Sequence, residues 1–182
     1  MKTIRFILFL LCLIAINTTS CEKDKSNVLP DETQEGNNTL GFLLNGKVWT
    51  SKVPYCSTMA SANKSNLLIG AGVGQSNKPY FGFCIKDAPI KTDTVYLLSS
   101  IYSFDFGEYG ERKSNGDIFQ YYTTDEYKGS VTLTKFDTIK QIVSGNFSLK
   151  AKRRITESND CYCDTIVTIT DGRFDLKYTR IK

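Results

Sequence analysis

The chain has 182 residues, of which 41% are hydrophobic, 23 are basic and 19 are acidic, and it contains no histidine. The lack of histidine excludes Ser-His-Asp and Cys-His catalysis and any histidine-ligated zinc or copper site. The charges are interspersed, without a basic stripe or a block of like charges, so we expect neither nucleic acid nor a polybasic membrane surface as a partner.

The start of the chain has the order of a bacterial export signal. Lys2 and Arg5 precede eleven uncharged, mostly aliphatic residues (6–16), and a short run of small polar residues then leads to Cys21. Eleven apolar residues are too few for a membrane-spanning helix, which needs about 20. Residues 1–20 therefore predict a signal peptide, whose removal leaves 162 residues with a net charge of +2, enough for one domain.

Cys21 at the cleavage point resembles the lipidated cysteine of bacterial lipoproteins, whose sulfur carries a diacylglycerol. Ser20 fits the lipobox of that class, whereas Thr18 stands where leucine is usual. Ordinary cleavage after Ser20, which would give a soluble exported protein, is the alternative. Cysteine arithmetic favours lipidation, because the mature chain keeps five cysteines and lipidating one leaves an even four. The resemblance implies an acylated lipoprotein of the outer membrane, on its periplasmic face or at the cell surface, with the membrane as a partner through the anchor.

The region after Cys21 is expected to contain a tether and one β domain. Residues 21–39 have too few hydrophobic residues to build structure, so they predict a flexible tether. Residues 40–182 are rich in glycine and aromatic residues, a composition typical of short twisted strands. The predicted fold is all-β, a single antiparallel β-sandwich of about nine to eleven strands. A closed or partly open, lipocalin-like β-barrel is the alternative.

Asn45-Gly46 lies between two apolar runs and predicts a hairpin with a type I′ turn, because both residues tolerate positive φ angles. A two-residue loop at this point pairs Phe42 with Trp49. Trp49 is interpreted as a core residue, with a ligand platform as the alternative.

Two further apolar runs, residues 66–73 and 79–86, predict a second hairpin, and residues 94–99 predict another strand. Glycines interrupt the second hairpin. They lack the Gly-Lys-Ser/Thr ending of a phosphate-binding loop, so bulges or close backbone approach explain them better.

The last third of the chain has the clearest alternation of apolar and polar residues. The odd-numbered apolar residues of 129–136 and of 143–149 share one face only if the loop between them, within 137–141, has three or five residues. Asp171-Gly172 predicts a third tight hairpin. Its two-residue loop pairs Ile169 with Phe174 on one face.

Residues 96–127 contain nine of the 22 aromatic residues. Tyr102, Phe104 and Phe106 alternate with polar residues, so they are expected to share one face of a strand, followed by a polar, glycine-rich loop over 107–116. Tyrosines beside acidic side chains suit stacking on, and hydrogen bonding to, a sugar or a peptide. The competing interpretation is that alternate rings of this window fill the core. The candidate ligand-binding residues are Tyr102, Phe104, Asp105, Glu108, Tyr109 and Tyr121.

Four cysteines remain beside the anchor: Cys56, Cys84, Cys161 and Cys163. An oxidising envelope favours disulfides. Cys161 and Cys163 lie on one strand face, so each is expected to pair with Cys56 or Cys84, with the connectivity open. A zinc ion held by four thiolates is the alternative, but the spacing lacks the paired two-residue intervals of such sites. No metal or other cofactor is expected.

The acidic residues do not indicate a reaction. Asp105 with Glu108, and Asp160 with Asp164, have no spacing that is diagnostic of acid–base catalysis or of calcium binding. We therefore expect a non-catalytic module that binds a glycan, a peptide or a protein. Three alternatives stay open: a carrier of a small apolar molecule inside a barrel, a carboxylate-based hydrolase with two converging acids, and a purely structural envelope component.

Four stretches share turn and core patterns with known sequences: Gly129 to Asp137, Ser144 to Ala151, Ile169 to Tyr178 and, more loosely, Asn45 to Trp49. In these stretches the chain resembles a family of short Bacteroidota-type lipoproteins with a β domain of unknown function. The resemblance implies an envelope location and an all-β fold. It transfers no active-site residue.

Overall fold

The computed structural model describes residues 28–51, 58–72, 79–100, 102, 105–112, 116–154 and 166–181, which form twelve β-strands and no helix. The strands are β1 (Thr39–Leu44), β2 (Lys47–Thr50), β3 (Thr58–Ala62), β4 (Leu67–Ala71), β5 (Tyr80–Ile85), β6 (Val95–Leu98), β7 (Phe106–Arg112), β8 (Ile118–Tyr122), β9 (Gly129–Asp137), β10 (Ile142–Arg153), β11 (Ile166–Lys177) and β12 (Thr179–Arg180). Within these ranges no helix has the length and apolar character that crossing a membrane requires.

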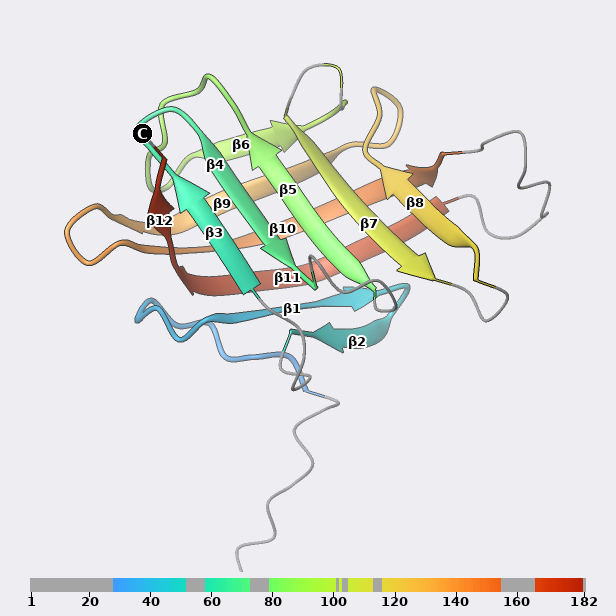
Figure 1. Ribbon diagram of the computed structural model, residues 1–182, viewed down its shortest axis with the longest axis horizontal. Helices are drawn as coiled ribbons and strands as arrows, with labels where there is room; N and C mark the ends of the chain where they lie inside the picture. Colours follow the sequence, from blue (N-terminus) through green and yellow to red (C-terminus); the bar gives the residue numbers. More distant parts are fainter. Residues whose placement is uncertain are drawn as a thin grey trace, which may run out of the picture.

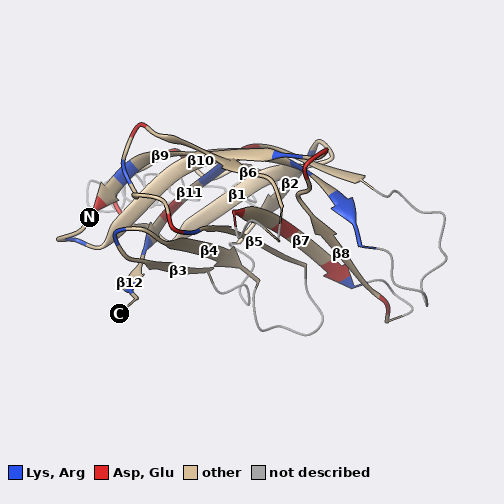
Figure 2. Cartoon of the chain, turned by 90° about the horizontal axis from the view of Figure 1, so that it is seen from above, with Lys and Arg blue, Asp and Glu red and all other residues tan. Residues whose placement is uncertain are grey.

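The strands belong to one hydrogen-bonded sheet that folds over into two layers (Figures 1 and 2). The order is β12-β3-β4-β5-β7-β8-β10-β11-β1-β2, and β9 pairs with β10 on one side and with β6 on the other. The first layer contains β3, β4, β5, β7 and β8, and the second contains β9, β10, β11 and β1. Among the described strands only the β12–β3 pair is parallel. The order begins at β12 and ends at β2, so the sheet is not closed into a barrel, and the predicted β-sandwich is confirmed. It has twelve described strands, one more than the upper limit of the prediction.

The hairpin of β1 and β2 has the predicted register. Asn45 and Gly46 have φ angles of 49° and 79°, the left-handed conformations that a type I′ turn requires. Phe42 pairs with Trp49, and their rings stack with centroids 4.6 Å apart. Trp49 packs against the core, as its main interpretation predicted. The antiparallel pairing of β4 with β5, and the position of β6, also confirm the predictions for those segments.

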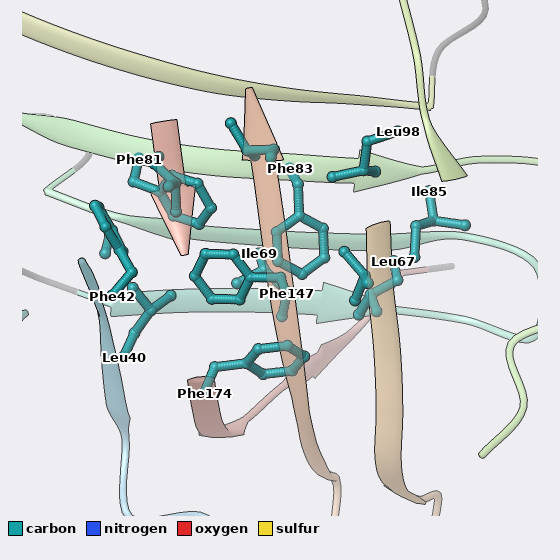
Figure 3. Packing of buried hydrophobic residues seen from close by; sticks show 14 of the residues in the cluster. Leu40, Phe42, Leu67, Ile69, Phe81, Phe83, Ile85, Leu98, Phe147 and Phe174 are labelled. Atoms are coloured by element: carbon teal, nitrogen blue, oxygen red, sulfur yellow. The ribbon is translucent and has the colours of Figure 1, made fainter. Parts of the chain in front are cut away.

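Five phenylalanine rings fill the space between the two layers (Figure 3). Phe147 of β10 lies among the other four. The centroid distances from its ring are 4.8 Å to Phe81, 5.9 Å to Phe42, 5.9 Å to Phe83 and 6.3 Å to Phe174. All five side chains are at most 4% exposed. At this level the interior is packed with side chains, which is how a sandwich rather than a ligand-filled barrel buries its apolar surface.

The connection between β9 and β10 differs from the prediction by one residue. Asp137 pairs with Ile142, which encloses a loop of four residues, so the predicted length of three or five is wrong. The register then shifts just before Gly145, and Val131 lies opposite Phe147. This β-bulge supplies the change in parity that the loop does not, and the apolar residues of both strands still share the inner face.

The prediction of a third hairpin at Asp171-Gly172 is wrong, because β11 continues through these residues as a single strand that is twelve residues long. Its two halves pair with β10 and β1 rather than with each other. Asp171 has a φ of 52°, and the register against both neighbours shifts in this region, which identifies a β-bulge. The bulge inverts the alternation, so Ile169 and Phe174 face the core together, as they would have done in a hairpin.

The strand β7 occupies much of the stretch for which a loop was predicted. Gly107 and Gly110 made this stretch look like a loop, but each is a place where another side chain approaches the backbone closely. Tyr102 lies in a turn before β7 and is 87% exposed, and Phe104 lies outside the described residues. The predicted strand face shared by residues 102–106 is therefore wrong, since the strand begins only at Phe106.

The predicted tether is also wrong for residues 28–38, which we call the N-terminal segment. This segment lies against the second layer and is held by the Asp175 carboxylate of β11, a residue that is only 1% exposed. Asp175 accepts five hydrogen bonds, four of them from the segment. The donors, at 2.6 to 3.1 Å, are the Thr33 hydroxyl, the backbone N–H groups of Glu35, Gly36 and Asn37, and the Ser144 hydroxyl of β10.

A second set of contacts attaches the same segment to neighbouring strands. The Arg173 guanidinium donates a hydrogen bond to the Pro30 carbonyl at 3.4 Å and lies 3.8 Å from the Glu32 carboxylate. The Lys135 ammonium donates to the Gln34 carbonyl at 2.8 Å. The folded domain thus includes residues from Val28 onward, whereas residue 40 was the predicted boundary.

Candidate functional site

The structure separates the six residues predicted to bind a ligand. Tyr109 and Tyr121 point between the layers, are 2% and 3% exposed, and have ring centroids 6.0 Å apart. They belong to the core, as the competing interpretation of the aromatic window held. Because both side chains are buried, they are not part of an exposed ligand-binding surface.

Asp105 directly precedes the first residue of β7, and Tyr102 lies in the turn before it. The Asp105 carboxylate accepts the backbone N–H of Lys86 at 2.6 Å, which ties this turn to the end of β5. Tyr102 is bound through its backbone N–H to the Ser100 hydroxyl at 3.3 Å, and its side chain is exposed. Neither side chain is packed into a group with Glu108.

Glu108 lies on the outer face of β7, because side chains alternate along a strand and its neighbour Tyr109 points inward. It pairs with Gly82 of β5 and with Tyr122 of β8. Gly82 has no side chain, and Oε1 of Glu108 lies 3.5 Å from the position that a Cβ of Gly82 would take. The carboxylate therefore rests across the neighbouring strand and is half-buried.

Four half-buried side chains share the outer face of the first layer with Glu108 and come from three adjacent strands. The alternation of side chains along each strand places them on this face. One comes from β5, one from β7 and two from β8. We call the five residues the Glu108 face: Tyr80, Phe106, Glu108, Gln120 and Tyr122. The sequence analysis missed all of them except Glu108. The inward alternation of Phe81, Phe83, Tyr109, Phe119 and Tyr121 was the signal that could have found them.

Hydrogen bonds join the polar groups of this face. Gln120 Nε2 donates to the Tyr80 hydroxyl at 2.9 Å. The Tyr80 hydroxyl is also hydrogen-bonded to that of Tyr122, which in turn is hydrogen-bonded to Arg154. The rings of Phe106 and Tyr122 lie 6.4 Å apart with their planes 52° from each other. Because three paired strands carry these groups, their relative positions are fixed by the sheet.

Among the described residues, none serves as a counterion for the carboxylate of Glu108. No hydrogen bond or ion pair reaches it from any residue that the structure describes. Burial raises the pKa of Glu108 above its ordinary value. Burial also raises the pKa of Tyr80 to about 12, although the Gln120 hydrogen bond partly opposes this. The tyrosine hydroxyls therefore stay protonated near neutral pH, and the one unpartnered charge of the face is negative.

Cys84 lies on the same side of β5, two residues beyond Gly82, and carries a free thiol. The predicted disulfide through Cys84 is therefore not supported. Burial, with the nearby charge of Asp105, raises the pKa of this thiol. Cys56, Cys161 and Cys163 lie outside the described residues. In the part of the chain that the structure does describe, no three acidic or cysteine side chains come together as a metal site would need.

The second layer has two shallow surface depressions, of about 290 and 390 Å³, that share Ser130 and Ser148. Serine and threonine side chains line much of both. The charged pair at the edge of the smaller one, Arg173 with Glu32, is 3.8 Å apart and thus compensated within the protein. We therefore regard the Glu108 face, with its uncompensated charge, as the stronger candidate site.

Gly110→Ala is expected to destabilise the domain by about 1 to 3 kcal/mol and to displace Tyr80 from the Glu108 face. The reason is that a Cβ at Gly110 would overlap the Tyr80 ring, which lies over this glycine. Urea denaturation of the wild type and the variant measures the effect. In a Tyr80→Ala background the same change should cost much less. An equal cost in both backgrounds would show that the ring contact is not the cause.

The fold and this face define a two-layer antiparallel β protein that presents a carboxylate among aromatic side chains on one outer surface. The chain matches no protein-family model, no curated protein and no solved structure.

Proposed function

We propose that this protein is a non-catalytic binding module of the bacterial envelope, anchored through a lipid on Cys21, and that its ligand contacts the Glu108 face. The observation that carries the proposal is the half-buried Glu108 carboxylate, which has no partner among the described residues and lies among three aromatic side chains. A charge kept in this state costs stability, and such costs are commonly retained where a ligand compensates them.

The chemistry of the face suits recognition rather than reaction. The strands hold an acceptor at Glu108, hydroxyl groups at Tyr80 and Tyr122, and an amide at Gln120, and these groups can hydrogen-bond a glycan or peptide. The rings of Phe106 and Tyr122 offer apolar surface against which such a ligand can stack. Because few rotamers are lost on a face already fixed by packing, binding has a small entropic cost.

A glycan and peptide array tests the binding function with the full-length protein in detergent. We expect the wild type to bind members of one class and Tyr122→Ala to lose that binding. Thr132→Ala, on the outer face of the second layer, is the matched control and should keep it. If Thr132→Ala loses binding while Tyr122→Ala retains it, the ligand site is on the other layer and the assignment to the Glu108 face is wrong.

Detergent-phase partition tests the anchor separately. The expected result is that the wild type enters the detergent phase whereas Cys21→Ala stays in the aqueous phase, since two acyl chains give stable membrane attachment. Recovery of both proteins in the aqueous phase would contradict lipidation at Cys21.

Glu108→Gln is expected to make the unliganded protein more stable at pH 7, by about 0.5 to 1 kcal/mol. The pKa of Glu108 is raised in the folded state by burial. Stability therefore falls as the pH rises from the unfolded value, about 4.3, through the folded pKa, and stays lower above it. Urea denaturation at pH 7 and pH 4 measures the difference, which should vanish at the lower pH. A variant that is less stable at pH 7 would reveal a stabilising partner of the carboxylate.

A further inference from the structure

We infer that the ligand group recognised at the Glu108 face is an organic cation, a protonated amine that lies against the aromatic rings and donates hydrogen bonds to the Glu108 carboxylate. This inference rests on the proposed binding function and names the chemical class of the group that binds. It is argued from three features of the face: the isolated charge, the surrounding rings, and the positions of the protein's own cations.

The first feature is the isolated carboxylate. Glu108 lies over Gly82 and between strands, where it is shielded from water more than a surface carboxylate is. A neutral hydrogen-bond donor would satisfy its lone pairs and leave its charge uncompensated. A protonated amine donates hydrogen bonds and also compensates the charge. A charge-assisted hydrogen bond is about twice as strong as a neutral one. The raised pKa of Glu108 agrees with a carboxylate that lacks such a partner.

The second feature is the set of rings around it. Phe106 is two residues from Glu108 on the same face of β7, and Tyr122 is its direct partner on β8. Their ring planes are tilted by 52° and do not stack face to face. Both side chains are only half-buried, so part of each is accessible to a ligand. The negative face of an aromatic ring attracts an ammonium group, by about 0.5 to 2 kcal/mol depending on its exposure.

The third feature is that the protein's own cations nearby are directed to other groups. Arg154 is hydrogen-bonded to the hydroxyl of Tyr122 rather than to the Glu108 carboxylate. The ammonium of Lys152 lies 5.8 Å from the centre of the Tyr127 ring. No described cation lies within ion-pair distance of Glu108, so a cation from a ligand does not have to displace one from the protein.

Two pairs of small molecules test the inference with the full-length protein in detergent at pH 6, where the amines are protonated. Glucosamine is compared with N-acetylglucosamine, and 1,5-diaminopentane with 1,5-pentanediol. Ligand-detected NMR titration gives the dissociation constants. We expect each amine to bind at least tenfold more tightly than its neutral counterpart. Preference within the sugar pair only, or within both pairs, distinguishes an amino sugar from an amine of any scaffold.

Variants assign the preference to the site. Glu108→Gln should reduce the tenfold preference to less than twofold, and Phe106→Leu, which keeps an apolar side chain, should reduce it partly. Thr132→Ala on the other layer should leave it unchanged. The raised stability expected for Glu108→Gln guards against a loss caused by unfolding.

Equal binding of charged and neutral members, or binding of neither pair, would overturn the cation inference. The proposed binding function would survive that result if the array still identified a ligand that Tyr122→Ala loses. A preference that Glu108→Gln leaves intact would also overturn the inference, because the cation would then bind elsewhere.

Discussion

Asp175→Asn is expected to lower the free energy of unfolding by about 3 kcal/mol, because it leaves a partly buried cluster of donors without a charged acceptor. In the wild type the three consecutive N–H groups of residues 35–37 converge on the carboxylate together with two hydroxyl groups. An asparagine amide keeps one acceptor oxygen but turns its NH₂ toward some of these donors. Urea denaturation measures the loss, and Glu35→Gln, which retains the same backbone N–H, should have almost no effect.

The same residue predicts how stability depends on pH. Burial by itself raises the pKa of Asp175, but the hydrogen bonds from Thr33, the segment backbone and Ser144 outweigh it and leave the pKa below its ordinary value. A depressed folded pKa contributes stability that is complete above the unfolded value, about 3.9, and is lost as the pH falls through the folded pKa. The wild type should therefore lose stability below about pH 4 more steeply than Asp175→Asn. Parallel acid denaturation curves would contradict this role.

Phe147→Ala is expected to destabilise the domain by about 3 to 5 kcal/mol, since it leaves a cavity among tightly packed rings. The Phe147 ring contacts four other phenylalanines from both layers and is 4% exposed. Phe147→Leu, which refills most of the volume, should cost about half as much or less. Urea denaturation gives both values. If alanine and leucine cost the same, the contact between the layers is not set by this ring.

The local signals predicted much of the fold, but the same turn signal led to two different structures. The Asn45-Gly46 turn was predicted together with its register, because a two-residue loop determines which residues pair. Asp171-Gly172 carried the same signal and produced a bulge instead. A turn and a bulge both change which side chains share a face, so alternation alone does not separate them. A bulge forms here rather than a turn because β10 and β1 pair with both halves of β11.

The N-terminal segment shows a second limit of sequence analysis. Its polar composition predicted a tether, because it offers little apolar surface to bury. It is held instead by the Asp175 carboxylate, more than 130 residues away along the chain. Hydrogen bonds between residues so far apart in the chain produce no periodic pattern in the sequence.

Of the five residues of the Glu108 face, only Glu108 was among the residues predicted to bind a ligand. The sequence analysis identified the aromatic-rich window, but Tyr109 and Tyr121 of this window face the core. Once β7 is known to be a strand, Phe106 and Glu108 must lie on the face opposite to Tyr109. The contribution of Tyr80 depends on the pairing of β5 with β7, which only the tertiary structure provides.

If the protein is anchored in the envelope as proposed, the attachment of the N-terminal segment to Asp175 has a consequence for how the domain is presented. Seven peptide units separate Cys21 from Val28, and a chain of that length reaches at most about 25 Å even when fully extended. With a lipid on Cys21, as proposed, this short linker keeps the layer that contains Asp175 close to the bilayer. Glu108 lies on the outer surface of the opposite layer. In that arrangement this surface would lie on the side of the domain away from the attached segment, accessible to molecules in the aqueous phase.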